Sequence, residues 1–192
     1  MPEFDLAFEK IGVLVESFQK NTPHYKSPAY TEAQARKDFI DKFWIALGWD
    51  VNHDRETNPY EQEVKVERGV ATGSSQRRAD YSFYLAPNFH DVLFFVEAKK
   101  PFVEIETREN YFQLIRYGWN SETPLAVLTD FEQFHVLDCR YRPDLDTALK
   151  RSLSKYFYTD LYGLTEEEVR VVEGGLRGMF LKKSKGQQFF EQ

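Results

Sequence analysis

Asp80 and the triplet Glu97-Ala98-Lys99 are residues of the types that bind a metal ion and assist hydrolysis. Residues at positions i and i+2 of a strand point to the same face, so a strand here would project Glu97 and Lys99 together while Ala98 points into the core. If Asp80 lies at the facing end of a neighbouring strand, its carboxylate joins Glu97 in an oxygen-rich cation site, with the Ala98 backbone carbonyl as an additional ligand. Such a site favours Mg²⁺, for which Mn²⁺ can substitute.

The chemistry expected of this site is hydrolysis of a phosphodiester. A bound Mg²⁺ would polarise a phosphate and lower the pKa of a bound water, and Lys99 could orient that water or stabilise the developing negative charge. The alternative is that Asp80 and Asp91 are strand-end charges and that Glu97 and Lys99 form a surface ion pair. Short motifs of this kind arise often by chance. The apolar run at residues 92–96 favours the site, because a buried strand gives little reason for charges at its end.

The elements that must position these residues are strands. Alternating apolar and polar residues predict two adjacent strands at 80–85 and 91–98, joined as a hairpin across a Pro-Asn turn. A further strand is predicted within residues 60–68, followed by a turn-like loop at 69–76. Two more strands are predicted at 125–129 and 133–137.

Helical periodicity marks residues 4–18, 32–47 and 109–119. Thr31 provides an N-cap for the second of these helices and Gly48 ends it. After Pro143 the pattern changes to charged helical segments at 145–158 and 169–181, with a frayed end. The sequence therefore predicts one domain at 1–144, which contains the candidate hydrolytic residues, and a helical extension or connector at 145–192.

Length and composition are those of a soluble globular protein. The chain has 192 residues, with 42% hydrophobic and 29% charged residues, enough for one sizeable core. A net charge of −6 argues against a protein that coats nucleic acid nonspecifically. Neither a signal peptide nor a membrane-length apolar run is found, so we expect a cytoplasmic protein. Cys139 lacks neighbouring zinc ligands and is expected to be a strand residue.

Two ordered motifs resemble those of a known superfamily. Asp80 followed by Val96-Glu97-Ala98-Lys99 resembles the nuclease core of the PD-(D/E)xK superfamily, although Ala79 stands where the superfamily's name has proline. Downstream, residues 113–117 resemble the QxxxY element of RecB-like nucleases and of the motor subunits of type I restriction enzymes. Two motifs in the expected order are more specific than one.

The resemblance extends over residues 28–140, to the N-terminal nuclease regions of type I and fused type IIG restriction-modification proteins. It implies a restriction-endonuclease-like fold, in which a mixed central β-sheet is flanked by helices, and catalysis by Asp80, Glu97 and Lys99. In that family an acidic residue on an early helix often assists metal binding, and Glu32 is the matching position.

Supporting roles are expected for Gln113 and Tyr117. Taken alone, this i, i+4 pair would be read as helix packing, but the resemblance places both residues at the border of the active site, where they contact phosphate or position the lysine. Basic residues at four further positions could contact the DNA backbone, although a solvated surface explains them about as well: Arg77, Arg78, Lys100 and Arg116.

The leading hypothesis is a Mg²⁺-dependent endodeoxyribonuclease domain of a restriction-modification enzyme, acting on double-stranded DNA. The alternatives are a noncatalytic DNA-binding or assembly module on the same fold and a RecB-like repair exonuclease. No helicase or methyltransferase motif is present, so methyltransferase, motor and target-recognition domains would lie elsewhere, on the same or another chain. Cutting both strands makes a transient dimer plausible.

Overall fold

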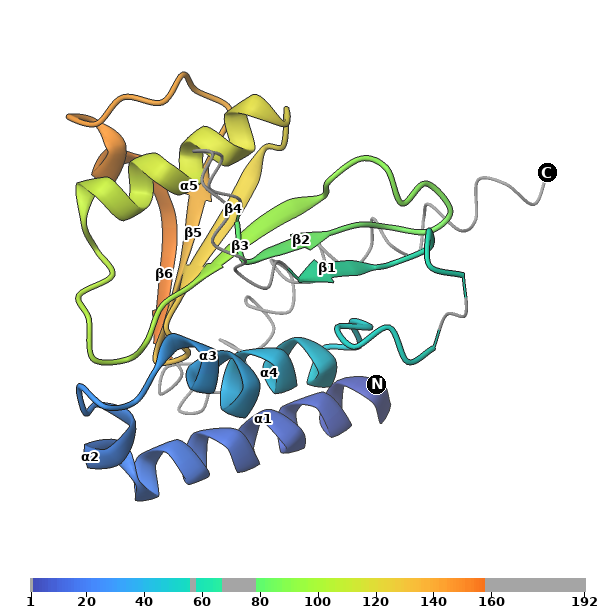
Figure 1. Ribbon diagram of the computed structural model, residues 1–192, viewed down its shortest axis with the longest axis vertical. Coiled ribbons are helices and arrows are strands. Elements are labelled where there is room, and N and C mark those ends of the chain that lie inside the picture. Colours follow the sequence, from blue (N-terminus) through green and yellow to red (C-terminus); the bar gives the residue numbers. More distant parts are fainter. Residues whose placement is uncertain (1, 56–57, 67–78, 158–192) are drawn as a thin grey trace.

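The computed structural model describes residues 2–55, 58–66 and 79–157 (Figure 1). Within these residues the chain forms helices, short helical turns and strands. In chain order they are α1 (Pro2–Lys20), α2 (Thr22–Tyr25), α3 (Glu32–Ala35), the π-helical turn η1 (Arg36–Ile40), α4 (Asp41–Ala46), β1 (Val64–Val66), β2 (Tyr81–Phe83), β3 (Phe94–Ala98), α5 (Arg108–Asn120), β4 (Leu125–Thr129), β5 (Gln133–Asp138), the 3₁₀ turn η2 (Ala148–Arg151) and β6 (Ser152–Phe157).

The strands of the described residues form one mixed sheet in the order β1-β2-β3-β4-β5-β6. Neighbouring strands are antiparallel except for β3 and β4, which run parallel. A parallel pair cannot be joined by a tight turn and needs a crossover connection, which α5 provides. The next element along the chain after β3, the strand that carries Glu97, is therefore a helix that packs over the sheet.

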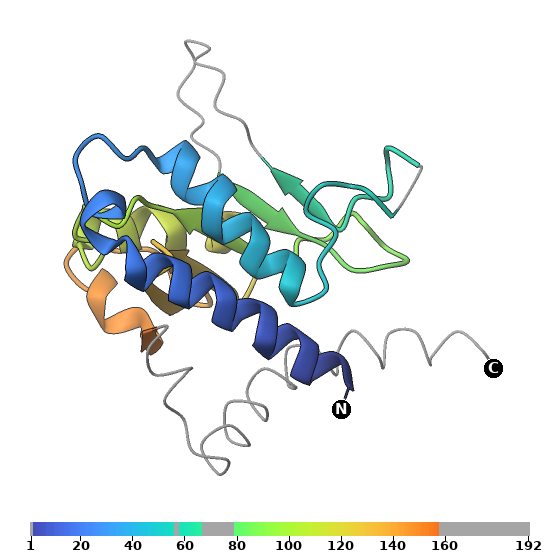
Figure 2. The same cartoon turned by 90° about the horizontal axis from the view of Figure 1, so that it is seen from below.

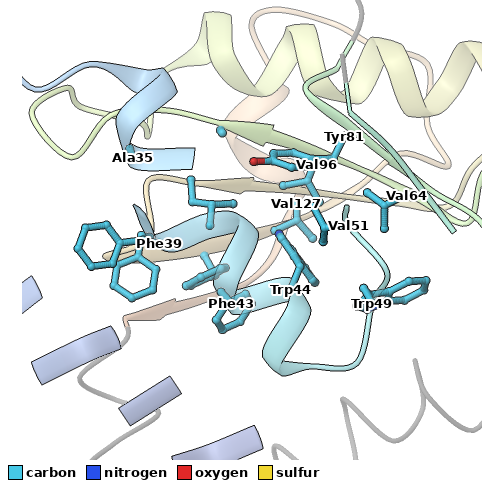
Figure 3. Close-up of a cluster of buried hydrophobic side chains, with 14 of the residues drawn as sticks. Ala35, Phe39, Phe43, Trp44, Trp49, Val51, Val64, Tyr81, Val96 and Val127 are labelled. Atoms are coloured by element: carbon cyan, nitrogen blue, oxygen red, sulfur yellow. The ribbon is translucent and has the colours of Figure 1, made fainter. Parts of the chain in front are cut away.

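Helices cover both faces of the sheet. Figure 1 shows α5 on one face and α1, α3 and α4 on the other, and Figure 2 shows α1 lying alongside α4. The face under α4 holds an aromatic core that includes Phe43 and Trp44 (Figure 3). In this core Phe83 stacks on Phe94 with ring centroids 4.4 Å apart, and Trp44 lies against both rings. The face under α5 is lined by aliphatic residues such as Leu114 and Leu128. These two cores hold β3 fully buried between them.

The helix that follows the first loop begins and ends as its sequence predicts. Thr31 and Gln34 form a capping box, in which the Thr31 hydroxyl accepts from the Gln34 backbone N–H and the Gln34 side chain accepts from the Thr31 N–H. Gly48, at φ +90°, follows its C-terminal end, a backbone conformation that favours glycine. Between α3 and α4 the π-helical turn η1 interrupts the regular helix, a feature that the periodicity does not predict.

The structure confirms the predicted α/β class, with a mixed central sheet flanked by helices. The predicted helices at 4–18 and 109–119 correspond to α1 and α5, and the predicted hairpin corresponds to the antiparallel strands β2 and β3. The strands predicted at 125–129 and 133–137 are β4 and β5.

One predicted element is wrong. The helix expected at residues 145–158 is replaced by η2 and by β6, which pairs antiparallel with β5 as a member of the sheet. Pairing with a neighbouring strand overrides a local helical pattern because strand preference depends strongly on context. The loop predicted at 69–76 and the helical extension from residue 158 on lie outside the described residues. Among the helices that are described, none is sufficiently long and apolar to cross a membrane.

Candidate active site

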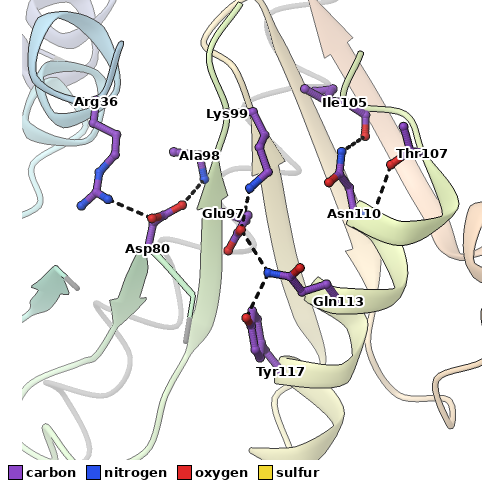
Figure 4. Close-up of polar contacts among 10 residues, drawn as sticks. All are labelled: Arg36, Asp80, Glu97, Ala98, Lys99, Ile105, Thr107, Asn110, Gln113 and Tyr117. Atoms are coloured by element: carbon purple, nitrogen blue, oxygen red, sulfur yellow. Dashed lines mark hydrogen bonds and ion pairs between the residues drawn. The ribbon is translucent and has the colours of Figure 1, made fainter. Parts of the chain in front are cut away.

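The candidate site lies where β3 ends, and its first residue, Glu97, is only 6% exposed. Phe95, two residues earlier, packs into the core under α5, whereas Val96 and Ala98 belong to the core on the opposite face. Glu97 therefore points toward α5 (Figure 4). This alternation confirms the prediction that Ala98 points into the core.

Glu97 and Lys99 form an ion pair, with 2.7 Å between Lys99 Nζ and Glu97 Oε1. Their side chains are 9% and 20% exposed, so this is not the surface ion pair of the alternative interpretation. Gln113 Nε2 donates to the same oxygen at 3.3 Å. The other oxygen, Oε2, is buried and has no hydrogen-bond partner within the described part of the chain.

The QxxxY element reaches the site from α5. Gln113 and Tyr117 lie one helical turn apart on the same face of the helix. Gln113 Nε2 donates to Tyr117 Oη at 3.0 Å as well as to Glu97 (Figure 4). Thr107 caps the helix by accepting from the Asn110 backbone N–H, which fixes where α5 begins. Gln113 and Tyr117 thus lie beside Glu97, as the sequence predicts.

Asp80 directly precedes β2 and reaches across to the end of β3. Its Oδ2 accepts from the Ala98 backbone N–H at 2.8 Å. Val96 is the last residue of β3 that pairs with β2, so the Asp80 carboxylate satisfies the N–H that lies two residues beyond the backbone ladder. Asp80 is consequently held next to Glu97, at the end of the neighbouring strand as the sequence predicts.

Arg36 also belongs to this cluster, although sequence reasoning did not identify it. Its Nη1 lies 2.8 Å from Asp80 Oδ1, and the two side chains are 15% and 16% exposed. The only local signal is that Arg36 follows Glu32 by four residues, which places both on one helix face. The residue that it would meet is 44 positions away along the chain.

Glu32, on α3, faces the same group of charges. The pKa of its carboxyl group is raised, first by burial and then by repulsion from Asp80, against the attraction of Lys99 and Arg36. Glu32 is therefore electrostatically coupled to the predicted catalytic residues, as expected from its position on the early helix. Thr31, which caps α3, fixes the turn of helix that carries it.

Burial and charge repulsion act together on Glu97. Its pKa is raised by burial first, with further repulsion from Asp80 and Glu32, while Lys99 opposes these effects. For Lys99 burial lowers the pKa, but the surrounding carboxylates of Glu97, Glu32 and Asp80 outweigh it and the net shift is upward. Lys99 accordingly remains positively charged at neutral pH.

The donors that could hold a divalent cation are the carboxylate oxygens of Asp80 and Glu97. As the side chains stand, the described residues contain no group of three or more His, Cys, Asp or Glu arranged to hold a metal ion. The buried and unpartnered Oε2 of Glu97 nonetheless fits a hard cation, since oxygen donors suit Mg²⁺ and a buried carboxylate oxygen is costly to leave unsatisfied. The Ala98 carbonyl stays a predicted ligand.

The predicted DNA-contacting residues are distributed differently. Arg77 and Arg78 lie outside the described residues. Lys100 Nζ donates to the Pro28 carbonyl at 3.4 Å and is electrostatically coupled to Glu32 at the site. Arg116 is exposed on α5, with its guanidinium 5.9 Å from the Phe112 ring centroid.

Two residues with reactive side chains belong to the packing rather than to the site. His135 Nδ1 lies 2.7 Å from the Tyr111 hydroxyl in the core under α5. Cys139, expected in a strand, directly follows β5, and burial raises the pKa of its thiol to about 12. A thiol of this kind is not reactive at neutral pH.

Comparison with known proteins gives one family match and one similar relative. Residues 31–151 match the family described as "Type I restriction enzyme R protein N terminus". The "Type II restriction enzyme and methyltransferase RM.Eco57I" of Escherichia coli is 33% identical over 163 residues, which are 83% of this chain and 16% of that protein. The chain thus matches less than a fifth of the relative's length. No solved structure matches significantly.

Proposed function

Because this chain belongs to the family of type I restriction enzyme R protein N-terminal regions, we propose that it is the DNA-cleaving domain of a restriction-modification enzyme. The reaction proposed is Mg²⁺-dependent hydrolysis of phosphodiester bonds in duplex DNA. Every described residue of the candidate site lies within the matched range of 31–151.

One observation carries this proposal: a nearly buried carboxylate, Glu97, has one oxygen held by Lys99 and Gln113 and the other without a partner. A buried charge of this kind destabilises a protein unless something compensates it. A divalent cation shared with Asp80, held next to Glu97 by the Ala98 N–H, would provide that compensation. When bound, Mg²⁺ supplies Lewis acidity toward the phosphate and a lowered pKa for a bound water.

The protein's own residues supply orientation and charge. Asp80 is fixed through both of its oxygens, by Arg36 and by the Ala98 N–H, so its carboxylate cannot rotate freely. Lys99 keeps its positive charge among Glu97, Glu32 and Asp80 and can stabilise the negative charge that develops on a phosphate in the transition state. Gln113 links Glu97 to Tyr117 and holds the acidic side chain in one rotamer.

The wider assembly is part of the proposal. The relative from Escherichia coli is by its name both a restriction enzyme and a methyltransferase, and this chain matches only 16% of it. We propose that methylation and target recognition, and any motor activity, belong to other segments of the same polypeptide or to partner chains. Cleavage of both DNA strands then needs two sites or two successive events, which a transient dimer would supply.

The direct test is cleavage of closed circular plasmid DNA by the purified chain with Mg²⁺ or Mn²⁺. We expect nicking or linearisation that falls about a hundredfold or more in Lys99→Ala, which loses the positive charge beside the reacting phosphate, and in Asp80→Ala, which loses a proposed ligand of the cation. Arg140→Gln serves as the control, since it breaks an arginine–aspartate ion pair at the opposite end of β5. Unchanged cleavage in both site variants would rule out this role.

The alternatives give different results in the same assay. A RecB-like exonuclease degrades linear DNA and spares closed circles. A noncatalytic module binds duplex DNA without dependence on metal and shows no calorimetric uptake of Mn²⁺. Mn²⁺ binding that disappears in Glu97→Ala supports the nuclease even if the chain needs its partner domains before it cuts DNA.

A further inference from the structure

Arg36 helps to orient Asp80 in the proposed function, but it has no part in the chemical step itself. Its Nη1 lies 2.8 Å from Asp80 Oδ1, and neither side chain is more than 16% exposed. In Figure 4, Arg36 and the Ala98 N–H approach the Asp80 carboxylate from two directions. The guanidinium therefore contacts the very carboxylate that is proposed to bind a cation.

Arg36 is itself held in place by Tyr81, the residue that follows Asp80 and begins β2. Its guanidinium carbon lies 4.9 Å from the centroid of the Tyr81 ring, within the range of a cation–π interaction. The Tyr81 hydroxyl donates to Asp41 Oδ1 at 2.6 Å, and Asp41 adds a second negative charge near Arg36. Arg36 is consequently a rigid part of the site rather than a mobile surface side chain.

The helix is shaped locally where Arg36 begins the π-helical turn. In this turn the backbone N–H of Asp41 donates to the carbonyl of Arg36, five residues back, instead of four as in an α-helix. Phe39 and Ile40 of the turn are buried in the core, while Arg36 points to Asp80. Turns of this type occur frequently at functional sites.

The charges of the cluster fall into pairs. Asp80 is paired with Arg36 and Glu97 with Lys99, so each proposed metal-binding carboxylate already has a basic partner. Glu32 adds a third carboxylate that interacts with both bases. A divalent cation arriving at Asp80 and Glu97 would meet two positive charges already in contact with its ligands.

We propose that Arg36 is the internal counter-cation of Asp80: it holds this carboxylate in place in the metal-free protein and lowers the affinity of the site for a divalent cation by competing with it. The inference rests on the proposed function, because it assigns Asp80 and Glu97 as the cation ligands. It adds a residue that sets metal affinity without contacting the reacting atoms.

The first experiment measures Mn²⁺ affinity by calorimetry in the whole 192-residue chain. Arg36→Gln keeps a hydrogen-bond donor for Asp80 but removes the charge, so we expect Mn²⁺ to bind about tenfold more tightly. Arg36→Lys keeps the charge and should bind Mn²⁺ about as the unmodified protein does. The control Arg140→Gln removes a different arginine–aspartate pair, in which Arg140 Nη2 lies 2.7 Å from Asp138 Oδ2, and should leave Mn²⁺ affinity unchanged.

The second experiment measures thermal unfolding with and without Mn²⁺. Without metal, Arg36→Gln should unfold at a lower temperature, because Asp80 loses its counter-charge close to Glu32 and Glu97. Added Mn²⁺ should raise its unfolding temperature by more than that of the unmodified protein, since tighter binding stabilises the folded state more. Arg140→Gln should show the same Mn²⁺ response as the unmodified protein.

A third measurement needs no destabilised variant. Nitrogen-15 NMR of arginine side chains in the unmodified protein should show the Arg36 signal, assigned by its absence from Arg36→Lys, shifting as Mg²⁺ is added. The Arg140 signal should stay in place. A stationary Arg36 signal at saturating Mg²⁺ would contradict competition at Asp80, even if Arg36→Gln failed to fold.

The outcomes separate the two proposals. Mn²⁺ binding that is lost in Glu97→Gln but is equal or weaker in Arg36→Gln would overturn the role of Arg36 and leave the proposed function intact. If neither the unmodified protein nor Arg36→Gln takes up Mn²⁺ or Mg²⁺, both proposals fail.

Discussion

At the scale of single residues, burial raises the pKa of two carboxyl groups, Glu97 and Asp130, that lie in different surroundings. Glu97 is the last residue but one of the core strand β3 and pairs with Lys99, and burial raises its pKa. Asp130 lies in the turn between β4 and β5, is 1% exposed and accepts from the Gln133 backbone N–H at 2.8 Å. Burial raises the pKa of Asp130 to about 7. A buried acid costs stability once it ionises, and only Glu97 lies where a cation is proposed to offset that cost.

Asp130→Asn should stabilise the protein above about pH 7. An acid whose pKa rises from 3.8 unfolded to about 7 folded binds its proton more tightly in the folded state. Stability is therefore lost as pH rises between these two values and stays lower above the folded pKa. The free energy of unfolding, measured in urea, should differ little between the two proteins near pH 4 and by on the order of 2–4 kcal/mol at pH 8. A difference that does not grow over this range contradicts the shift.

Residue spacing predicted the part of the site that is local in sequence. Glu97 and Lys99 share a face because strand side chains alternate, and Gln113 and Tyr117 share one because four residues make about one helical turn. The pairing of Arg36 with Asp80 spans 44 residues and depends on how the π-helical turn packs against β2. No local pattern encodes that distance, so the pair could be found only in the folded structure.

At the scale of elements, α5 approaches the sheet unusually closely at Gly118. A Cβ atom added there would lie 2.5 Å from both Cβ and Sγ of Cys139. Side-chain atoms cannot approach so closely without displacement of the helix or the strand end. The neighbouring residue, Tyr117, belongs to the candidate site. The contact at Gly118 therefore also sets the distance between the sheet and the polar residues of α5.

Gly118→Ala should lower the free energy of unfolding by about 1–3 kcal/mol, because the added methyl overpacks the contact with Cys139. Urea unfolding monitored by circular dichroism measures this change. Asn120→Ala, at the exposed last residue of α5, should change stability by less than about 0.5 kcal/mol. The cost of Gly118→Ala should shrink in a Cys139→Gly background, and an unchanged cost there would show that the clash is not its cause.

Hydrophobic periodicity was sufficient to predict the helices and strands that have a strong local pattern, but it failed to predict β6. In α5, Leu114 and Ile115 are buried at helical spacing, and β3 is apolar throughout. In β6 the exposed positions hold Leu153 and Lys155, and the positions between them hold Ser152, Ser154 and Tyr156. Exposure therefore alternates along the strand but hydrophobicity does not, and the sequence shows neither a strand pattern nor a buried run. Its strand conformation comes from pairing with β5, which is a property of the assembled sheet.

At the scale of the whole molecule, the sheet continues past the predicted boundary at residue 144. Ala148 is 1% exposed in the core under α5, and Tyr156 of β6 packs against the core on the other face. Residues 148–157 therefore contribute to both cores and cover the edge of β5. We expect the folded unit to extend at least to residue 157.

Truncation tests this expectation. A protein ending at residue 144 should unfold at lower urea concentration than one ending at residue 157, because it lacks β6 and the buried Ala148. It should also self-associate in size-exclusion chromatography, since the uncovered edge of β5 offers unpaired backbone groups. Equal urea midpoints for the two proteins would place the boundary at 144 after all.

The parallel pairing of β3 with β4 has a consequence for how such a site can be inherited. Because parallel neighbours need a crossover, Glu97, Lys99, Gln113 and Tyr117 all lie on one uninterrupted stretch of chain, β3–α5–β4. Asp80 and Arg36 come from outside this stretch. Fusion of this intact stretch to another protein would transfer most of the candidate site in a single piece, and the recipient would need to provide counterparts of Asp80, Arg36 and Glu32.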